Sequence, residues 1–158
     1  MMLERDELFM KEALKEAKRA FDAGEVPVGA VLVHQNRVIA RGHNQVELLQ
    51  DATAHAEVLC LSAGSQALSN WRLVETTLYC TLEPCPMCAG ALLSARVTRL
   101  VWGAPDLRLG ANGSWVDLLT MRHPMHAVSV TSRVLEAEAA DLMRTFFQKQ
   151  RHKSRPFA

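Results

Sequence analysis

Apolar residues recur along the first part of the chain with the spacing of an amphipathic helix. Within residues 6–21, Met10, Leu14 and Ala17 are three or four positions apart, so their side chains share one face. Gly24 follows, and glycine often ends a helix. The pattern therefore predicts an N-terminal helix that packs by this face against the rest of the protein.

The pattern then changes to short runs rich in valine and isoleucine, which are typical of strands. Residues 28–34 and 37–42 form two such runs, and Gln35-Asn36 between them predicts a tight turn. Strands and helices then alternate, which predicts an α/β fold: a three-layer α/β/α sandwich whose mixed, mostly parallel five-stranded sheet carries helices on both faces. The later elements, in chain order, are a polar loop at 44–54, a helix at 55–68, a strand at 76–81, a helix at 86–95, a strand at 99–102, a loop at 103–113, a strand at 127–131 and a helix from 134 to about 150.

Composition and charge add two points. The 158 residues are 49% hydrophobic, enough for one core, and no repeat or linker divides residues 1–158 into smaller domains. The net charge of +1 excludes a strong overall field for nucleic acid or membrane. The charge is uneven, however, because Asp141 is the last acidic residue, and we expect a basic C-terminal helix and tail from about residue 134. The cations after Asp141 are Arg144, Lys149, Arg151, Lys153 and Arg155.

The N-terminus and the cysteines bear on the cellular compartment. Glu4, Asp6 and Glu7 interrupt any apolar run of the kind found in a signal peptide. No segment approaches the roughly 20 apolar residues of a membrane span. Four cysteines without a secretory signal indicate a reducing compartment and metal chemistry rather than disulfides. We therefore expect a cytoplasmic protein, or the mature form of an organellar one, and no membrane contact.

Two short motifs carry the candidate chemistry: His55-Ala56-Glu57 and Pro84-Cys85-Pro86-Met87-Cys88. One imidazole and two thiolates are typical zinc ligands, and three protein ligands leave a fourth position open for water. H-x-E followed by P-C-x-x-C is the signature of zinc-dependent nucleobase deaminases. We predict that His55, Cys85 and Cys88 bind one Zn²⁺ per subunit, and that Glu57 is the catalytic acid and base.

The spacing within the motifs predicts where the metal lies. Residues two apart in a helix interior point to different sides, so His55 and Glu57 can serve one site only from the first turn of a helix. Cys85 and Cys88 are three apart and share a face at the start of the next predicted helix. The simplest arrangement places the metal between two helix N-termini, where thiolates are stabilised.

Other readings of the cysteines remain open. C-x-x-C alone is also found in redox sites and in structural zinc sites, and a structural site needs a fourth ligand. The candidates for a fourth ligand are Cys60, Cys80, His34, His43, His123 and His126. None of them forms a second paired motif, and we interpret Cys60 and Cys80 as buried small hydrophobic residues.

A catalytic zinc of this kind predicts hydrolytic deamination. The metal lowers the pKa of water toward about 7. Glu57 would accept the water proton, the hydroxide would add to a ring carbon that carries an amine, and Glu57 would deliver protons to the ring nitrogen and to the departing ammonia. This chemistry needs no nucleophilic side chain and no organic cofactor.

Over residues 6–150 the chain resembles the bacterial-type tRNA-specific adenosine deaminases, members of the cytidine-deaminase-like superfamily. The zinc motifs are shared by the wider superfamily, guanine deaminases included, and the segment 103–114 is the more selective one. The resemblance implies one CMP/dCMP-type zinc deaminase domain that converts adenosine to inosine at the wobble position, 34, of a tRNA anticodon stem-loop. It also implies a homodimer. The segments that carry the resemblance are 25–31, 53–57, 81–91, 102–106 and 110–114.

The resemblance also implies substrate contacts at matching positions. Asn44 would hydrogen-bond the target base, and an amide can both donate and accept at a purine edge. Val28, together with Val26 and Pro27, would form an apolar wall for the base, and Ala56 would lie beside it. The contacts implied for the anticodon loop are Asp106, Arg108, Phe147 and Arg151.

Two other function classes stay open. A free-base or nucleoside deaminase, of the guanine or cytosine type, would carry the same zinc motifs but would not depend on the basic C-terminus. A non-catalytic zinc module that binds RNA is the other alternative. Glu57 argues against it, because a structural zinc site gains nothing from a carboxylate that does not bind the metal.

Overall fold

The structure is a computed structural model that describes residues 1–153, so Arg155 of the predicted basic tail lies outside the described part. Its elements follow the predicted ranges closely, with one additional short helix. In chain order they are α1 (Met2–Asp22), β1 (Gly29–His34), β2 (Arg37–His43), α2 (Val46–Leu49), α3 (Ala56–Leu68), β3 (Thr76–Leu82), α4 (Pro86–Ser94), β4 (Arg99–Ala104), β5 (Ser129–Thr131) and α5 (Glu136–Lys153).

The five strands form one sheet in the order β2-β1-β3-β4-β5. β1 is antiparallel to both of its neighbours, β2 and β3, whereas β3–β4 and β4–β5 are parallel pairs. All strands except β1 therefore run in one direction, which confirms the predicted mixed and mostly parallel sheet. One consequence governs the site: β2, β3 and β4 all end at the same edge.

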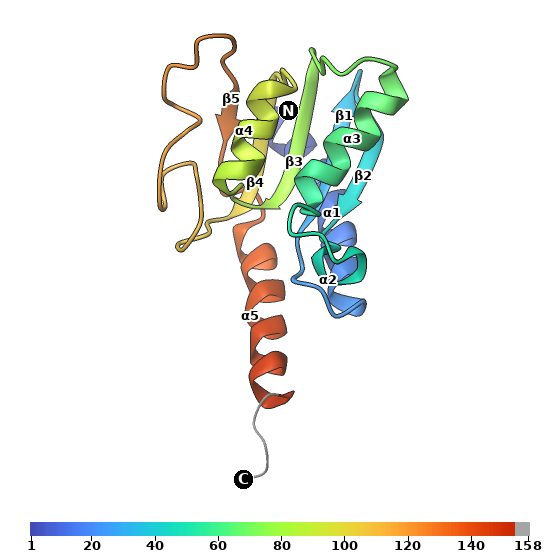
Figure 1. The fold of residues 1–158 in the computed structure, drawn as a ribbon, viewed down its shortest axis with the longest axis vertical. Coiled ribbons are helices and arrows are strands. Elements are labelled where there is room, and N and C mark those ends of the chain that lie inside the picture. Colours follow the sequence, from blue (N-terminus) through green and yellow to red (C-terminus); the bar gives the residue numbers. More distant parts are fainter. Residues whose placement is uncertain (154–158) are drawn as a thin grey trace.

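Alternate residues of each central strand point into two separate cores. Ala30 and Leu32 of β1 pack in the cluster that includes residues of α3 and α4. Val31 and Val33 pack with residues of α1 on the opposite face. α5 lies against β4, β3 and α1, and Figure 1 shows α3 and α4 in front of the sheet with α1 behind it. The predicted three-layer arrangement is confirmed.

Two glycines, Gly29 and Gly42, let helices approach the sheet more closely than a residue with a side chain would allow. A Cβ at Gly29 of β1 would lie 2.2 Å from the Ala13 carbonyl oxygen of α1. A Cβ at Gly42 of β2 would lie 2.5 Å from the Ala56 carbonyl oxygen. The absence of a side chain at Gly42 thus lets the first turn of α3 rest directly on β2.

Two places between β1 and α3 show how the prediction compares with the structure: the hairpin turn agrees with it, and the polar loop differs from it. The hairpin turn has positive φ at both central residues, Gln35 (49°) and Asn36 (62°), as a tight two-residue turn requires. The predicted polar loop 44–54 contains α2, which has no buried residue of its own. Periodicity could not reveal this helix, because its N-terminal N–H groups are satisfied by Glu25, a residue distant in the sequence.

A buried ion pair joins the first helix to three strands. The Arg99 guanidinium of β4 donates two hydrogen bonds to the Asp6 carboxylate of α1, with N···O distances of 2.7 and 2.6 Å. The Tyr79 hydroxyl of β3 donates to the same carboxylate at 2.9 Å, and Arg99 also donates to Thr131 of β5 at 2.8 Å. Burial by itself would raise the pKa of Asp6, but the bonds from Arg99 and Tyr79 outweigh it and lower the pKa.

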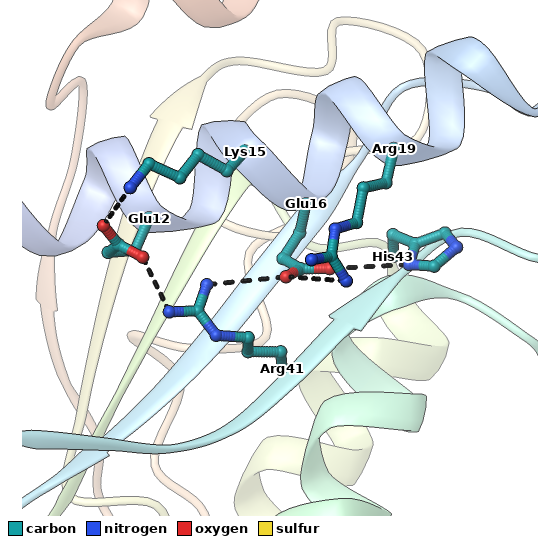
Figure 2. Close-up of polar contacts among 6 residues, drawn as sticks. All are labelled: Glu12, Lys15, Glu16, Arg19, Arg41 and His43. Atoms are coloured by element: carbon teal, nitrogen blue, oxygen red, sulfur yellow. Dashed lines mark hydrogen bonds and ion pairs between the residues drawn. The ribbon is translucent and has the colours of Figure 1, made fainter.

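A second charged cluster ties α1 to β2, which is an edge strand (Figure 2). The Glu16 side chain is only 2% exposed and lies 3.4 Å from Arg41 Nη1 and 3.5 Å from His43 Nδ1. Glu12 bridges Lys15 and Arg41, at 2.6 Å from each. The contacts hold the carboxyl end of β2 against α1, immediately before Asn44.

None of the described helices is both long and apolar enough to span a bilayer.

We expect Asp6→Asn to destabilise the protein by about 3 kcal/mol at pH 7, because it leaves Arg99, whose side chain is only 17% exposed, without its counter-charge. The Asp6 pKa is lowered on folding, so its stabilisation is complete above the ordinary value of 3.8 and is lost as the pH falls through the folded-state pKa. Urea unfolding followed by circular dichroism should show that the difference in unfolding free energy between wild type and variant becomes smaller as the pH is lowered.

The exposed pair Asp141–Arg144 provides the matched control. Asp141→Asn should change the free energy of unfolding by less than about 1 kcal/mol. Equal effects of the two substitutions would contradict the role assigned to the buried pair.

Candidate active site

The two motifs meet at the edge of the sheet where β2, β3 and β4 end. His55 is the residue that caps the start of α3, and Cys85 caps the start of α4 with Pro86 in the first turn. The His55 carbonyl accepts from Leu59 N at 3.0 Å, and the Cys85 carbonyl accepts from Ala89 N at 2.8 Å. Figure 1 shows both helices starting at this edge. The predicted meeting of two helix N-termini is therefore present.

Three atoms able to bind a metal converge there, one from His55 and two from cysteines 30 and 33 residues later in the sequence. His55 Nδ1 lies 3.6 Å from Cys85 Sγ and 3.5 Å from Cys88 Sγ, and all three atoms lie within 4.8 Å of one another. Zinc bonds of about 2.3 Å to sulfur and 2.0–2.1 Å to nitrogen, at tetrahedral angles, would place nitrogen and sulfur about 3.6 Å apart. The donor set and its spacing thus fit a tetrahedral zinc ion.

The local electrostatics favour a thiolate at Cys85 alone, because the hydrogen bond between the two cysteines raises the pKa of Cys88. A hydrogen bond from Cys88, supported by His55, lowers the pKa of Cys85 to about 4. The hydrogen bond with Cys85 raises the pKa of His55. A thiolate at the start of α4 also lies at the positive end of the helix dipole. The site is thus prepared to receive a cation.

Glu57 lies in the first turn of α3, next to the triad. Its side chain is buried, with only 4% of the residue exposed, and burial raises the pKa of its carboxyl group. Glu57 also borders the pocket that His55 and Cys85 line. A buried carboxyl group at a pocket wall, beside a cation site, is suited to accept and return protons.

The pocket has a volume of about 640 Å³ and contains most of the predicted substrate residues. Volumes of this size are typical of sites for small ligands or single nucleotides. Arg151 is exposed on α5 and does not line the pocket, whereas its neighbour Gln150 does. The predicted residues that line the pocket are Val28, Asn44, His55, Ala56, Glu57, Cys85, Asp106, Arg108 and Phe147.

Asn44 is held by two local hydrogen bonds. Its Nδ2 donates to the Val26 carbonyl at 3.2 Å, and its Oδ1 accepts from Val46 N at 3.2 Å. An amide group has two N–H donors and an oxygen with two lone pairs. One donor and one lone pair therefore remain for a ligand, while the two local bonds fix the orientation of the side chain.

The outer wall comes from α5 and from the loop after β4. Phe147 is 40% exposed and meets Phe146 edge to face at 5.4 Å, while Phe146 is buried against Phe21. Both phenylalanines border the pocket, and Phe147 is the more exposed of the two. The Asp106 carboxylate accepts from Arg108 N and Leu109 N, both at 3.2 Å, and so shapes the loop that carries Arg108.

Two further buried carboxylates at the pocket were not singled out from the sequence. Glu25 accepts from Glu47 N and Leu48 N, at 2.9 and 2.8 Å, and so supports α2. Glu83 accepts hydrogen bonds from the loop after β4. Both stand in segments that carry the family resemblance, but their partners lie more than 20 residues away, so no local pattern shows their role.

Comparison with known proteins places the chain in a family. The model of the MafB19-like deaminase family matches residues 4–151. The tRNA-specific adenosine deaminase of Bacillus subtilis is 48% identical over 151 residues, covering 96% of this chain and 94% of the relative. The chloroplastic tRNA(adenine(34)) deaminase of Arabidopsis thaliana is 55% identical over 90% of this chain, which spans only 12% of that longer protein.

Solved structures agree with the sequence comparison. A chain from a study of A-to-I editing by tRNA deaminases at the wobble position superposes with a TM-score of 0.82 and 46% identity, covering 85% of this chain and 97% of that one. A structure in complex with 8-azaguanine superposes with a TM-score of 0.79 and 26% identity, covering 91% and 85%. From the extent and identity of these matches, this chain belongs to the family of tRNA-specific adenosine deaminases.

Proposed function

We propose that this chain hydrolyses adenosine 34 of tRNA to inosine, using one Zn²⁺ held by His55, Cys85 and Cys88, with Glu57 as acid and base. The observation that carries the proposal is that the ligand atoms of His55, Cys85 and Cys88 lie within 4.8 Å of one another, beside a pocket that Glu57 also lines. The names of relatives at 46–55% identity support the substrate. When bound, zinc supplies the Lewis acidity that makes water a nucleophile near neutral pH.

Glu57 moves the protons of the reaction. Its carboxylate removes a proton from water as the water oxygen forms a bond to C6 of adenine, and it then delivers that proton to N1. In the second half of the reaction it passes the remaining hydroxyl proton to the exocyclic nitrogen. The C6–N bond breaks, ammonia leaves, and the carbonyl of inosine remains. Burial of Glu57 suits this cycle, because raising its pKa brings its acid and base forms closer in energy.

The remaining predicted residues orient the RNA. The free donor and acceptor of Asn44 would bind the purine edge, and the base would lie against Val28 and Ala56. A base must leave the stack to enter such a pocket. Phe147 offers a stacking surface for a neighbouring base, and Asp106 is placed to meet the adjoining sugar and backbone. The cations Arg108 and Arg151 are both exposed and would contact phosphates.

A free guanine deaminase is the second candidate. The structural similarity to a chain in complex with 8-azaguanine supports it. Its identity is 26%, against 46% for the chain from the tRNA deaminase study. A pocket wall that includes exposed Phe147 and Arg108 also favours a substrate that continues beyond one base.

A homodimer remains a prediction, and the outer faces of α3 and α4 are its proposed interface. A shallow pocket of about 380 Å³ lies between these helices, lined mainly by apolar and small residues. Trp71 at its border is 53% exposed. A cytoplasmic location also remains a prediction, since the name of the Arabidopsis relative assigns that protein to the chloroplast.

We expect the purified protein to contain one zinc per chain and Cys88→Ala to retain less than about a tenth of it, because three protein ligands are the minimum for a stable catalytic site. Metal content can be measured by mass spectrometry of the desalted protein. Cys60→Ala is the control: this buried cysteine is not in the triad and should keep its zinc. Equal zinc content in the two variants would contradict the ligand assignment.

We expect wild-type protein to form inosine at position 34 of a tRNA that carries adenosine there, and Glu57→Gln to lower kcat by about 10³-fold while retaining zinc. Inosine can be mapped by sequencing of the reverse transcript. Guanine should be tested in parallel. Ending the chain after Phe147 should abolish activity on tRNA; activity on guanine alone, unaffected by the truncation, would support the second candidate instead.

We expect Ser62→Glu, which adds a charge to the α3–α4 face, to raise the dimer dissociation constant at least about tenfold, because a twofold axis brings like charges together. Sedimentation equilibrium measures the constant. Gln66→Glu is the matched control, an exposed α3 position that does not line the shallow pocket. Identical monomeric behaviour of wild type and both variants would reject the dimer.

A further inference from the structure

Glu83 is a buried charged residue that takes no part in the proposed proton transfers. It follows β3 and precedes the metal-ligand residue Cys85 by two positions. The residue is only 1% exposed. Burying a carboxylate is costly unless hydrogen bonds replace those to water, so its partners indicate what it does.

Those partners all come from the loop that follows β4. Glu83 Oε1 accepts from Asp106 N at 3.2 Å, and Oε2 accepts from Asn112 N at 2.9 Å and Ser114 N at 3.3 Å. The Ser114 hydroxyl also donates to Oε1. One carboxylate therefore gathers donors from both ends of the segment 106–114, which carries the predicted RNA residues Asp106 and Arg108.

Two further features close the loop around the same group. A Cβ at Gly110 would lie 2.3 Å from the Glu83 carboxyl carbon, so any side chain there would have to displace this carboxyl group from its hydrogen-bonded position. The backbone of Ala111 donates to the Pro84 carbonyl at 2.8 Å, directly beside Cys85. The loop thus folds around Glu83 and is tied to the chain segment that carries the metal ligand.

We propose that Glu83 is a positioning residue for tRNA: it couples the loop 105–114 to the Cys85 segment, so that Asp106 and Arg108 stand at a set distance from the reacting base. The inference rests on the proposed function for the identity of the RNA. The hydrogen bonds between Glu83 and the loop do not depend on the proposed function.

The coupling predicts which step depends on Glu83. A carboxylate that only stabilised the metal-binding turn would affect zinc content and kcat. A carboxylate that orders the RNA loop affects binding instead, because a loosened loop must be ordered again when tRNA binds. The separation of KM from kcat therefore distinguishes the two roles.

The test is Glu83→Gln, which keeps the shape of the side chain but replaces one acceptor oxygen with a donor. At least one loop N–H group then loses its partner. We expect faster amide hydrogen exchange confined to residues 105–114, a KM for tRNA raised about tenfold, kcat within about twofold of wild type, and unchanged zinc. Hydrogen exchange is measured by mass spectrometry on the zinc-loaded protein without RNA.

Two variants sharpen the test. Glu25→Gln also alters a buried carboxylate at the pocket, but its hydrogen bonds go to Glu47 and Leu48, so faster exchange should appear near residues 46–49 and not at 105–114. Gly110→Ala keeps Glu83 but places a methyl group against its carboxyl group. This variant should reproduce the amide hydrogen-exchange pattern of Glu83→Gln.

The outcomes separate this inference from the proposed function. Unchanged exchange at 105–114 in Glu83→Gln, or loss of zinc and kcat with an unchanged KM, would overturn the role of Glu83. If wild-type protein forms no inosine, the proposed function fails and with it the tRNA part of the inference, while the exchange data still decide whether Glu83 orders the loop.

Discussion

The common direction of β2, β3 and β4 is the constraint on which the rest of the site depends. Because these strands end at one edge of the sheet, the segments that follow them start there together. α3 and α4 both begin at this edge. Their N-terminal capping residues are His55 and Cys85, and the His55 Nδ1 and Cys85 Sγ atoms lie 3.6 Å apart. Ligands commonly bind at the carboxyl ends of strands in α/β sheets for this reason. The two helix N-termini add a field that favours thiolates at the same point.

The buried carboxylates of this protein perform different tasks according to what faces them. Glu57 lies beside the sulfurs and borders the pocket, where the proposed reaction needs a group that moves protons. Glu25 and Glu83 accept hydrogen bonds from backbone N–H groups and serve as anchors for α2 and for the loop after β4. Asp6, on the far face of the sheet, faces a guanidinium and holds α1 to the strands. Burial is common to all four, and the partner decides the role.

The arrangement also explains how one fold serves different substrates. The structure in complex with 8-azaguanine shares this fold at 26% identity. The inner pocket wall is built by the ends of the strands and the first turns of α3 and α4. The outer wall comes from the loop after β4 and from α5, elements that can change without disturbing the metal triad. Function in such folds is decided by the site rather than by the architecture.

Local patterns in the sequence were sufficient to predict the elements and to single out the candidate metal-binding group and Glu57, whose roles are proposed. The i, i+2 spacing of His55 and Glu57 and the i, i+3 spacing of Cys85 and Cys88 already required two helix starts at one place, and the order of strands and helices indicated the sheet. Only the tertiary structure could reveal the features that depend on contacts between distant segments. It stabilised α2 through Glu25, paired Asp6 with Arg99, and wrapped the loop after β4 around Glu83. Those partners are separated by 22 to 93 residues, and no periodicity links them, because a hydrogen bond between distant segments depends on how the layers pack and not on the spacing of neighbours.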